Sequence, residues 1–207
     1  MFETAERAPS HADNLIARPT TMTTVEAHIS EVRDVLARMP SREVERVIDV
    51  ILAAYRGRRH VYVIGNGGSA STASHFACDL AKATITGVRA RLRATSLTDN
   101  IALLTAWAND SSYEAVFAEQ LANLLDPGDV VVAISASGKS PNILAAIGAA
   151  RGRGAVTVGL VGFTGGPLKK MVDVVVHVPS ESYGVVEDCH LVLEHAITAA
   201  LRGALAD

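Results

Sequence analysis

The chain has 207 residues, of which 49% are hydrophobic and only 4% aromatic, and its formal net charge is −3. This length and composition predict one domain with a large core, and the charge argues against a nucleic-acid-binding groove. No apolar run reaches the roughly 18 uncharged residues that a membrane-spanning helix needs. Two cysteines are too few for a disulfide framework, and no signal-peptide pattern opens the chain, so we expect a cytoplasmic protein.

Residues 1–21 are polar and contain two prolines, which predicts a flexible N-terminal arm ahead of a single domain over 22–207. From Thr23 to Pro40, and again over 44–55, apolar residues recur at steps of three and four. This spacing predicts two amphipathic helices ahead of the first strand. We expect these helices to serve packing or dimerisation rather than catalysis.

Four short apolar runs predict buried strands at 61–64, 130–134, 156–161 and 174–178, and 89–95 predicts a short exposed strand. Helical patterns fill the intervals, at 69–84, 99–107, 113–125, 141–150, 167–171 and 183–205. This alternation predicts an α/β fold with a doubly wound, mainly parallel sheet between two layers of helices. Ligands of such sheets bind outside the carboxyl ends of the strands.

Two polar turns follow predicted strands at that edge of the sheet. The first strand runs into Gly65-Asn66-Gly67-Gly68-Ser69, and the strand at 130–134 runs into a turn that carries three hydroxyls, on Ser135, Ser137 and Ser140. Each turn leads into a helix, whose free N–H groups attract an anion. Hydroxyls together with helix N–H groups suit a phosphate monoester better than a coenzyme diphosphate, so the two turns predict a phosphate site.

Histidines and carboxylates recur on two of the predicted helices. His75 and Asp79 are four residues apart and therefore share a helix face. The last helix carries Glu187, His190, Glu194 and His195 on one broad face. Such a set can ligate Zn²⁺ or another divalent ion, or it can move protons beside a carbonyl; the spacing leaves both open. His190 and Glu194 are predicted at supporting or surface positions. A further polar residue, Asp110, either simply ends a helix or binds a sugar hydroxyl.

Four segments resemble the SIS (sugar isomerase) domain family: GNGGS at 65–69, HFACDL at 75–80, AND at 108–110 and AISASGKS at 133–140. Within that family they resemble the phosphoheptose isomerase branch, which converts sedoheptulose 7-phosphate to glycero-manno-heptose 7-phosphate. The resemblance covers about residues 25–205. It implies a flavodoxin-like three-layer fold, a sugar-phosphate substrate, and a homotetramer, or a dimer, whose subunits share active sites.

The resemblance also implies roles for individual residues. The phosphate-contacting positions match Ser69, Ser135, Ser137 and Ser140, within loops that include Gly67 and Gly68. Asn66 and Asp110 match positions that touch the sugar. His75 and His195 match a pair that binds zinc in several members, and His195 would also act as the catalytic acid/base. Asp79 stands where the family has its catalytic and metal-binding Glu, and Glu187 stands where it has a Gln.

These two exchanges leave the assignment of catalytic and metal-binding carboxylates open. Asp is one methylene shorter than Glu, which would set an Asp79 base about 1.5 Å further back. Glu187 adds a negative charge that favours either metal binding or a role as the base. We therefore predict a phosphosugar isomerase in which Asp79 or Glu187 removes the proton beside the carbonyl. The alternatives are a non-catalytic SIS protein, which senses sugar phosphates or binds a replication initiator, and a SIS isomerase for another phosphosugar.

Overall fold

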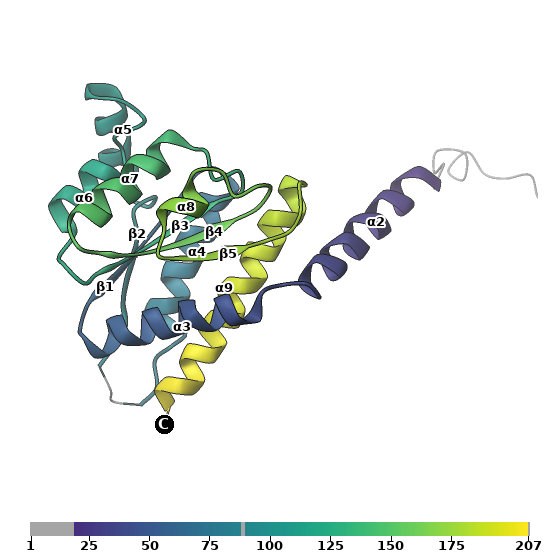
Figure 1. Ribbon diagram of the computed structural model, residues 1–207, viewed down its shortest axis with the longest axis horizontal. Helices are drawn as coiled ribbons and strands as arrows, with labels where there is room; N and C mark the ends of the chain where they lie inside the picture. The colour runs from purple at the N-terminus through teal and green to yellow at the C-terminus, as the bar shows by residue number, and fades with distance from the viewer. Residues whose placement is uncertain (1–18, 88–89, 207) are drawn as a thin grey trace, which may run out of the picture.

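The structure is a computed structural model that describes residues 19–87 and 90–206 (Figure 1). At its centre is a five-stranded sheet in the order β2-β1-β3-β4-β5, in which every neighbouring pair of strands is parallel. The strands are β1 (His60–Gly65), β2 (Arg93–Ser96), β3 (Val130–Ser135), β4 (Val156–Val161) and β5 (Val174–His177). Helices cover both faces of the sheet, so the predicted doubly wound α/β fold is confirmed.

The helices found in the described residues are α2 (Pro19–Leu36), α3 (Ser41–Arg56), α4 (Gly68–Lys82), α5 (Ile101–Asp110), α6 (Ala118–Leu124), α7 (Pro141–Gly152), α8 (Leu168–Met171) and α9 (Tyr183–Ala206). The two helices predicted ahead of the first strand are α2 and α3. Helix α2 begins at Pro19 and so includes the last three residues of the arm predicted over 1–21. The remainder of that arm lies outside the described residues.

The hydrophobic core is divided into two clusters by the sheet. In β1, Val61 and Val63 pack on the face covered by α3, α4 and α9. Tyr62 and Ile64 belong to the opposite face, which α6, α7 and α8 cover. This alternation follows from the two-residue period of a strand. Because both faces are covered, β1, β3, β4 and β5 are largely apolar, which is why they were recognisable as short apolar runs. The edge strand β2 is partly exposed and carries Arg93.

The strand order places a topological switch point between β1 and β3. From β1 the chain moves outward to β2, and then it returns to β3 on the other side of β1. In open parallel sheets, ligands bind at the carboxyl ends of the strands that flank such a point. The two polar turns predicted to bind phosphate are the loop between β1 and α4 and the loop between β3 and α7, so the fold brings them to the same crevice.

One predicted helix, over 113–125, is shorter than expected. Only its second half forms α6, while residues 113–117 form turns. Phe117 still reaches the core, where it is 1% exposed, and the Tyr113 hydroxyl donates a hydrogen bond to Asn66 Oδ1 over 3.1 Å. These tertiary contacts outweigh a weak local preference for helix. The edge strand predicted over 89–95 is β2, which begins at Arg93 and ends at Ser96; residue 89 lies outside the described residues.

Two features bear on the class of protein. Within the described residues, no helix combines the length and the apolar character needed to cross a membrane. Cys78 and Cys189 are both free thiols. Burial raises the pKa of Cys189 to about 11, so this thiol stays protonated and unreactive at neutral pH.

His190 on α9 is expected to make the fold sensitive to acid. Its side chain is 1% exposed, and burial lowers the pKa of its imidazole from 6.5 to about 4. Between pH 6.5 and pH 4, His190 is therefore protonated in the unfolded chain but neutral in the folded chain. The free energy of unfolding falls as the pH drops through this range, by up to roughly 3 kcal/mol.

The measurement is urea unfolding of wild type and His190→Leu at pH 7 and pH 5. We expect the variant to lose less stability between these two values than wild type loses, whatever its absolute stability. Equal losses in the two proteins would show that His190 does not set the acid sensitivity.

Candidate functional site

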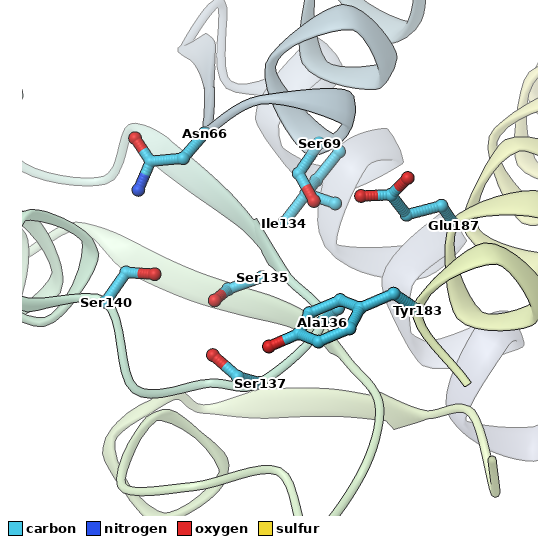
Figure 2. Close-up of a pocket in the computed structure, with 9 residues that line it drawn as sticks. All are labelled: Asn66, Ser69, Ile134, Ser135, Ala136, Ser137, Ser140, Tyr183 and Glu187. Atoms are coloured by element: carbon cyan, nitrogen blue, oxygen red, sulfur yellow. The ribbon is translucent and has the colours of Figure 1, made fainter. Parts of the chain in front are cut away.

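A cavity of about 180 Å³ lies at the carboxyl ends of β1 and β3. Its walls are formed by Asn66, Ser69, Ile134, Ser135, Ala136, Ser137, Ser140, Tyr183 and Glu187. Figure 2 shows the three serines of the β3–α7 loop with their hydroxyls in one space, with Asn66 and Ser69 across from them and the Tyr183 ring beside Ser137. Every serine predicted to contact phosphate therefore lines one cavity, as does the predicted sugar-binding residue Asn66.

The loop between β1 and α4 requires glycine at two positions. A Cβ atom added to Gly65 would lie 2.3 Å from the Ser69 backbone oxygen, so the turn closes too tightly for any side chain. Gly67 has φ +57°, a left-handed conformation that favours glycine. The resulting turn places Ser69 in the first turn of α4 and directs the free N–H groups of that helix towards the crevice, where they favour an anion.

In the loop between β3 and α7, serine hydroxyls accept hydrogen bonds from the loop's own backbone N–H groups. The Gly138 N–H donates to Ser135 Oγ over 3.2 Å, and the Lys139 N–H donates to Ser137 Oγ over 3.3 Å. Ser140 is the N-cap residue of α7, and Pro141 occupies the first turn. The cavity therefore lies between the N-termini of two helices and is lined with hydroxyls, and neither Lys nor Arg is among its described lining residues. Hydrogen-bond donors, rather than a fixed positive charge, face any anion that binds.

Asn66 is held by hydrogen bonds from two residues that were not predicted at the site, Asn142 and Tyr113. Its amide nitrogen donates to Asn142 Oδ1, and the Asn142 nitrogen donates back to Asn66 Oδ1, each over 2.9 Å. The Tyr113 hydroxyl adds a third hydrogen bond to the Asn66 amide. Asn142 is 2% exposed and lies in the first turn of α7. The amide of Asn66 is therefore fixed in orientation, with one N–H left to face the cavity.

Helix α9 brings two further side chains to the same cavity. Glu187 lies with its carboxylate against the start of α4, so a Cβ atom added to Gly68 would be 2.5 Å from Glu187 Oε2. Tyr183, whose ring packs on Phe163 with centroids 4.6 Å apart, was not predicted. Because Tyr183 is the first residue of α9, no periodic pattern in the sequence indicated that it faces the cavity.

A second group of polar side chains lies further along α4 and α9. It consists of His75, Asp79, Glu194 and His195, which each offer one ligand atom within 4.8 Å of all the others. Asp79 Oδ1 lies 3.9 Å from His75 Nε2, and Asp79 Oδ2 lies 4.0 Å from His195 Nε2. The structure thus brings three of the four predicted metal ligands together. Glu187, the fourth, is outside this group, and its role as a ligand stays a prediction.

Glu194 takes part in this group although it was predicted at a supporting or surface position. Its side chain is completely buried, with Oε1 lying 3.2 Å from His75 Nδ1 and 3.5 Å from His195 Nε2. Burial, with the Asp79 carboxylate as the second cause, raises the pKa of Glu194 to about 8. The sequence placed Glu194 on the correct helix, but four polar residues on one face do not indicate which of them is covered by α4.

Asp110 is not brought to the cavity within one chain. It is exposed at the end of α5, where it accepts a hydrogen bond from the Asn109 side chain over 2.8 Å. Helix α5 projects from the body of the molecule (Figure 1) and contains no buried residue. The predicted contact between Asp110 and a sugar therefore stays a prediction.

The serine-lined cavity and the His–carboxylate group are connected by the same two helices. His75 lies six positions after Ser69 on α4, and His195 lies eight positions after Glu187 on α9. At a rise of about 1.5 Å per residue, the two groups are roughly 9–12 Å apart along the helices. That separation is comparable to the length of a phosphorylated sugar, so one molecule could place its phosphate in the cavity and its carbonyl end beside the histidines.

Comparison with known proteins places the chain in a family. The family model of the SIS domain matches residues 27–162. The chain is 38% identical to the phosphoheptose isomerase of Geobacter metallireducens over 176 residues, which are 85% of this chain and 92% of that protein. It is 41% identical to the phosphoheptose isomerase of Mycobacterium tuberculosis over 157 residues, which are 76% of this chain and 80% of that protein.

The fold is also similar to solved structures. That of the phosphoheptose isomerase from Neisseria gonorrhoeae superposes with a TM-score of 0.83 at 29% identity, covering 89% of this chain and all of the other. A phosphoheptose isomerase from Francisella tularensis gives a TM-score of 0.81 at 25% identity, covering 94% of this chain and all of the other. The chain therefore belongs to the SIS domain family, and within it to the phosphoheptose isomerase branch.

Proposed function

We propose that the protein is an aldose–ketose isomerase that converts sedoheptulose 7-phosphate to glycero-manno-heptose 7-phosphate. The observation that carries this proposal is the connection, along α4 and α9, between a hydroxyl-lined anion cavity and a group of histidines and carboxylates. The names of the curated relatives support the same reaction.

The cavity provides the phosphate site. Ser69, Ser135, Ser137 and Ser140 would donate hydrogen bonds to the phosphate oxygens, together with backbone N–H groups of the loops that contain Gly67 and Gly68. Charge-assisted hydrogen bonds to a dianion are stronger than neutral ones, and two helix N-termini favour the negative charge. Asn66, fixed by Asn142, would hold a sugar hydroxyl, and Asp110 is proposed for the same role.

The isomerisation needs a base and a proton shuttle at the carbonyl end. Asp79 or Glu187 would remove a proton from carbon 1 of the ketose, so that the C–H electrons form the carbon–carbon double bond of an enediol. His195 would move the proton between the two oxygens, and a proton returned to carbon 2 completes the aldose. Because no oxidant or second substrate is needed, these side chains are sufficient for the chemistry.

The same group of residues fits a divalent ion such as Zn²⁺. Two imidazoles with nearby carboxylates are a donor set that Zn²⁺ prefers, and the oxygens of Glu194 are buried without a hydrogen-bond partner. His75, Asp79 and His195 would hold the ion, whereas Glu187, the fourth ligand predicted from the sequence, does not lie in this group. Such an ion, when bound, would polarise the carbonyl of the sugar.

The proposed activity is tested by incubating the protein with a panel of ketose phosphates in D₂O, with Zn²⁺ and separately with a chelator. We expect an aldose product from sedoheptulose 7-phosphate that carries solvent deuterium at carbon 2. Tight binding of phosphosugars without turnover would instead favour the non-catalytic SIS protein. Turnover of a different member of the panel would favour an isomerase for another phosphosugar.

Ser137→Ala is expected to raise KM for the sugar phosphate by about 10- to 100-fold while changing kcat little, because one hydrogen bond to a charged group contributes roughly 1.5–3 kcal/mol. That bond is present in both the ground state and the transition state, so its loss acts on binding. Steady-state kinetics measure both constants. Ser71→Ala is the control, since Ser71 is exposed on α4 and does not line the cavity. An unchanged KM for Ser137→Ala would contradict the phosphate assignment.

We further propose that the protein assembles as a homotetramer, or as a dimer, with active sites shared between subunits. Helix α2 leaves Val25 and Ile29 exposed by 48% and 61%, and α5 leaves Ile101 exposed by 65%. Both helices extend from the body of the molecule (Figure 1), and apolar side chains on such projections suit subunit contacts. Light scattering coupled to gel filtration would measure the assembly. A cytoplasmic location, supported by the two free thiols, stays a prediction.

A further inference from the structure

Glu194 carries a buried carboxyl group that the proposed isomerase mechanism does not use. Both of its carboxylate oxygens are inaccessible to solvent, and neither has a hydrogen-bond partner. A buried carboxyl group without hydrogen bonds is costly, and such groups are normally hydrogen-bonded or bound to a metal ion. The carboxylate therefore needs an explanation beyond the stability of the fold.

The distances around Glu194 match those within a metal centre. In a tetrahedral zinc site, where each ligand atom lies about 2.0–2.2 Å from the ion, neighbouring ligand atoms are about 3.4 Å apart. Glu194 Oε1 is 3.2 Å from His75 Nδ1 and 3.5 Å from His195 Nε2. Asp79 Oδ1 is 3.9 Å from Nε2, the other ring nitrogen of His75, and Asp79 Oδ2 is 4.0 Å from His195 Nε2. Of the two carboxylates, Glu194 thus has the closer fit to these distances.

The geometry also favours direct ligation over a hydrogen bond to the histidine. A carboxylate that only orients a metal-bound imidazole accepts its ring N–H in a well-aligned hydrogen bond. At 3.2 Å, Glu194 Oε1 and His75 Nδ1 are close enough for one, yet the pair lacks the alignment and no hydrogen bond forms. One imidazole gives an ion only one of its nitrogens, and His75 faces Glu194 with Nδ1 but Asp79 with Nε2. His195 Nε2 faces both carboxylates, 3.5 Å from Glu194 Oε1 and 4.0 Å from Asp79 Oδ2, so Glu194, Asp79 and His195 are arranged around a common point. Asp79 and Glu194 together supply the two negative charges that offset a divalent cation.

We propose that Glu194 is a direct ligand of the divalent ion at this centre, together with His75, Asp79 and His195, and that Glu187 lies outside the ligand shell. The inference rests on the metal centre of the proposed function, but it concerns ion binding and not catalysis. Glu187 remains at the phosphate cavity, where its carboxylate packs against Gly68. In this chain the carboxylate ligand on α9 thus comes from a position two turns further along the helix.

The test is ion binding by the full chain, without substrate. Metal-free wild type, Glu194→Gln, Glu194→Leu and Glu187→Gln are titrated with Zn²⁺ against a chromophoric chelator, and Co²⁺ spectra report the ligand geometry. We expect both Glu194 variants to weaken Zn²⁺ binding by more than the roughly 10- to 100-fold typical of supporting residues, with a changed Co²⁺ spectrum. Glu187→Gln, the matched control on the same helix, should stay within about threefold of wild type, since it removes no ligand.

The outcomes separate this inference from the isomerase proposal. Wild-type affinity in both Glu194 variants, a loss in Glu187→Gln alone, or a wild type that binds no ion would each overturn it. Thermal unfolding of the metal-free proteins checks folding, and Glu194→Leu should be at least as stable as wild type because it removes a buried polar group that has no hydrogen-bond partner. Zinc binding with the expected pattern but no turnover of any sugar phosphate would uphold the ligand and overturn the isomerase.

Discussion

Asp79→Asn is expected to lower kcat for sedoheptulose 7-phosphate by about 10²- to 10⁴-fold, the usual contribution of a positioned general base. Asp79 lies about 4 Å from both histidines, with one carboxylate oxygen turned towards each. Glu187 is instead packed against the first residue of α4, at the phosphate end of the site. Of the two carboxylates predicted as the base, Asp79 is therefore the one placed beside the proposed carbonyl position.

The matched variant for this prediction is Glu187→Gln, which keeps the shape of the side chain and removes its charge. If Asp79 is the base, Glu187→Gln should retain kcat to within about tenfold, below the range for loss of a base. Single-turnover measurement of deuterium exchange at carbon 1 reports proton removal separately from product release. The reverse order of effects would assign the base to Glu187, and full activity in both variants would remove both residues from the mechanism.

The strands and the phosphate loops were predictable because each depends on a short, local pattern. A strand covered on both faces is an uninterrupted apolar run, and glycines and serines at the end of such a run mark a tight turn into a helix. The serines at 69, 135, 137 and 140 came together because parallel strands end at one edge of the sheet. The position of that edge follows from topology and needs no knowledge of side-chain packing.

The residues that escaped prediction depend on which neighbour covers them. Asn142 looked like an ordinary residue in the first turn of a helix, but it pairs with Asn66, which is 76 residues away in the chain. Glu194 and Glu187 both lie on α9, and helical spacing gave no reason to prefer one over the other near His195. Only the packing of α4 against α9 makes that choice. Whether a polar residue on one helix is buried depends on the helix that packs against it, so the sequence of its own helix does not predict its burial.

Gly138→Ala is expected to destabilise the protein by about 2–5 kcal/mol and to abolish tight phosphate binding. Gly138 has φ +63°, and a Cβ atom there would lie 2.0 Å from the Gly165 backbone oxygen. A left-handed backbone conformation costs a non-glycine residue about 1–3 kcal/mol, and overpacking costs a similar amount. Moving the loop to relieve the contact would break the hydrogen bond from the Leu168 N–H to the Gly138 oxygen.

The hydroxyls of Ser135 and Ser137 bond to the backbone on either side of Gly138, so a displaced loop would also misplace the groups that face the phosphate. Urea unfolding and calorimetric titration with inorganic phosphate measure the two effects. Gly148→Ala is the control, because Gly148 lies in α7 with open space around it, where alanine should be neutral or stabilising by up to about 1 kcal/mol. If Gly138→Ala matched this control in both measurements, the β3–α7 loop would not be the rigid half of the anion site, and the phosphate would have to be held chiefly by the start of α4.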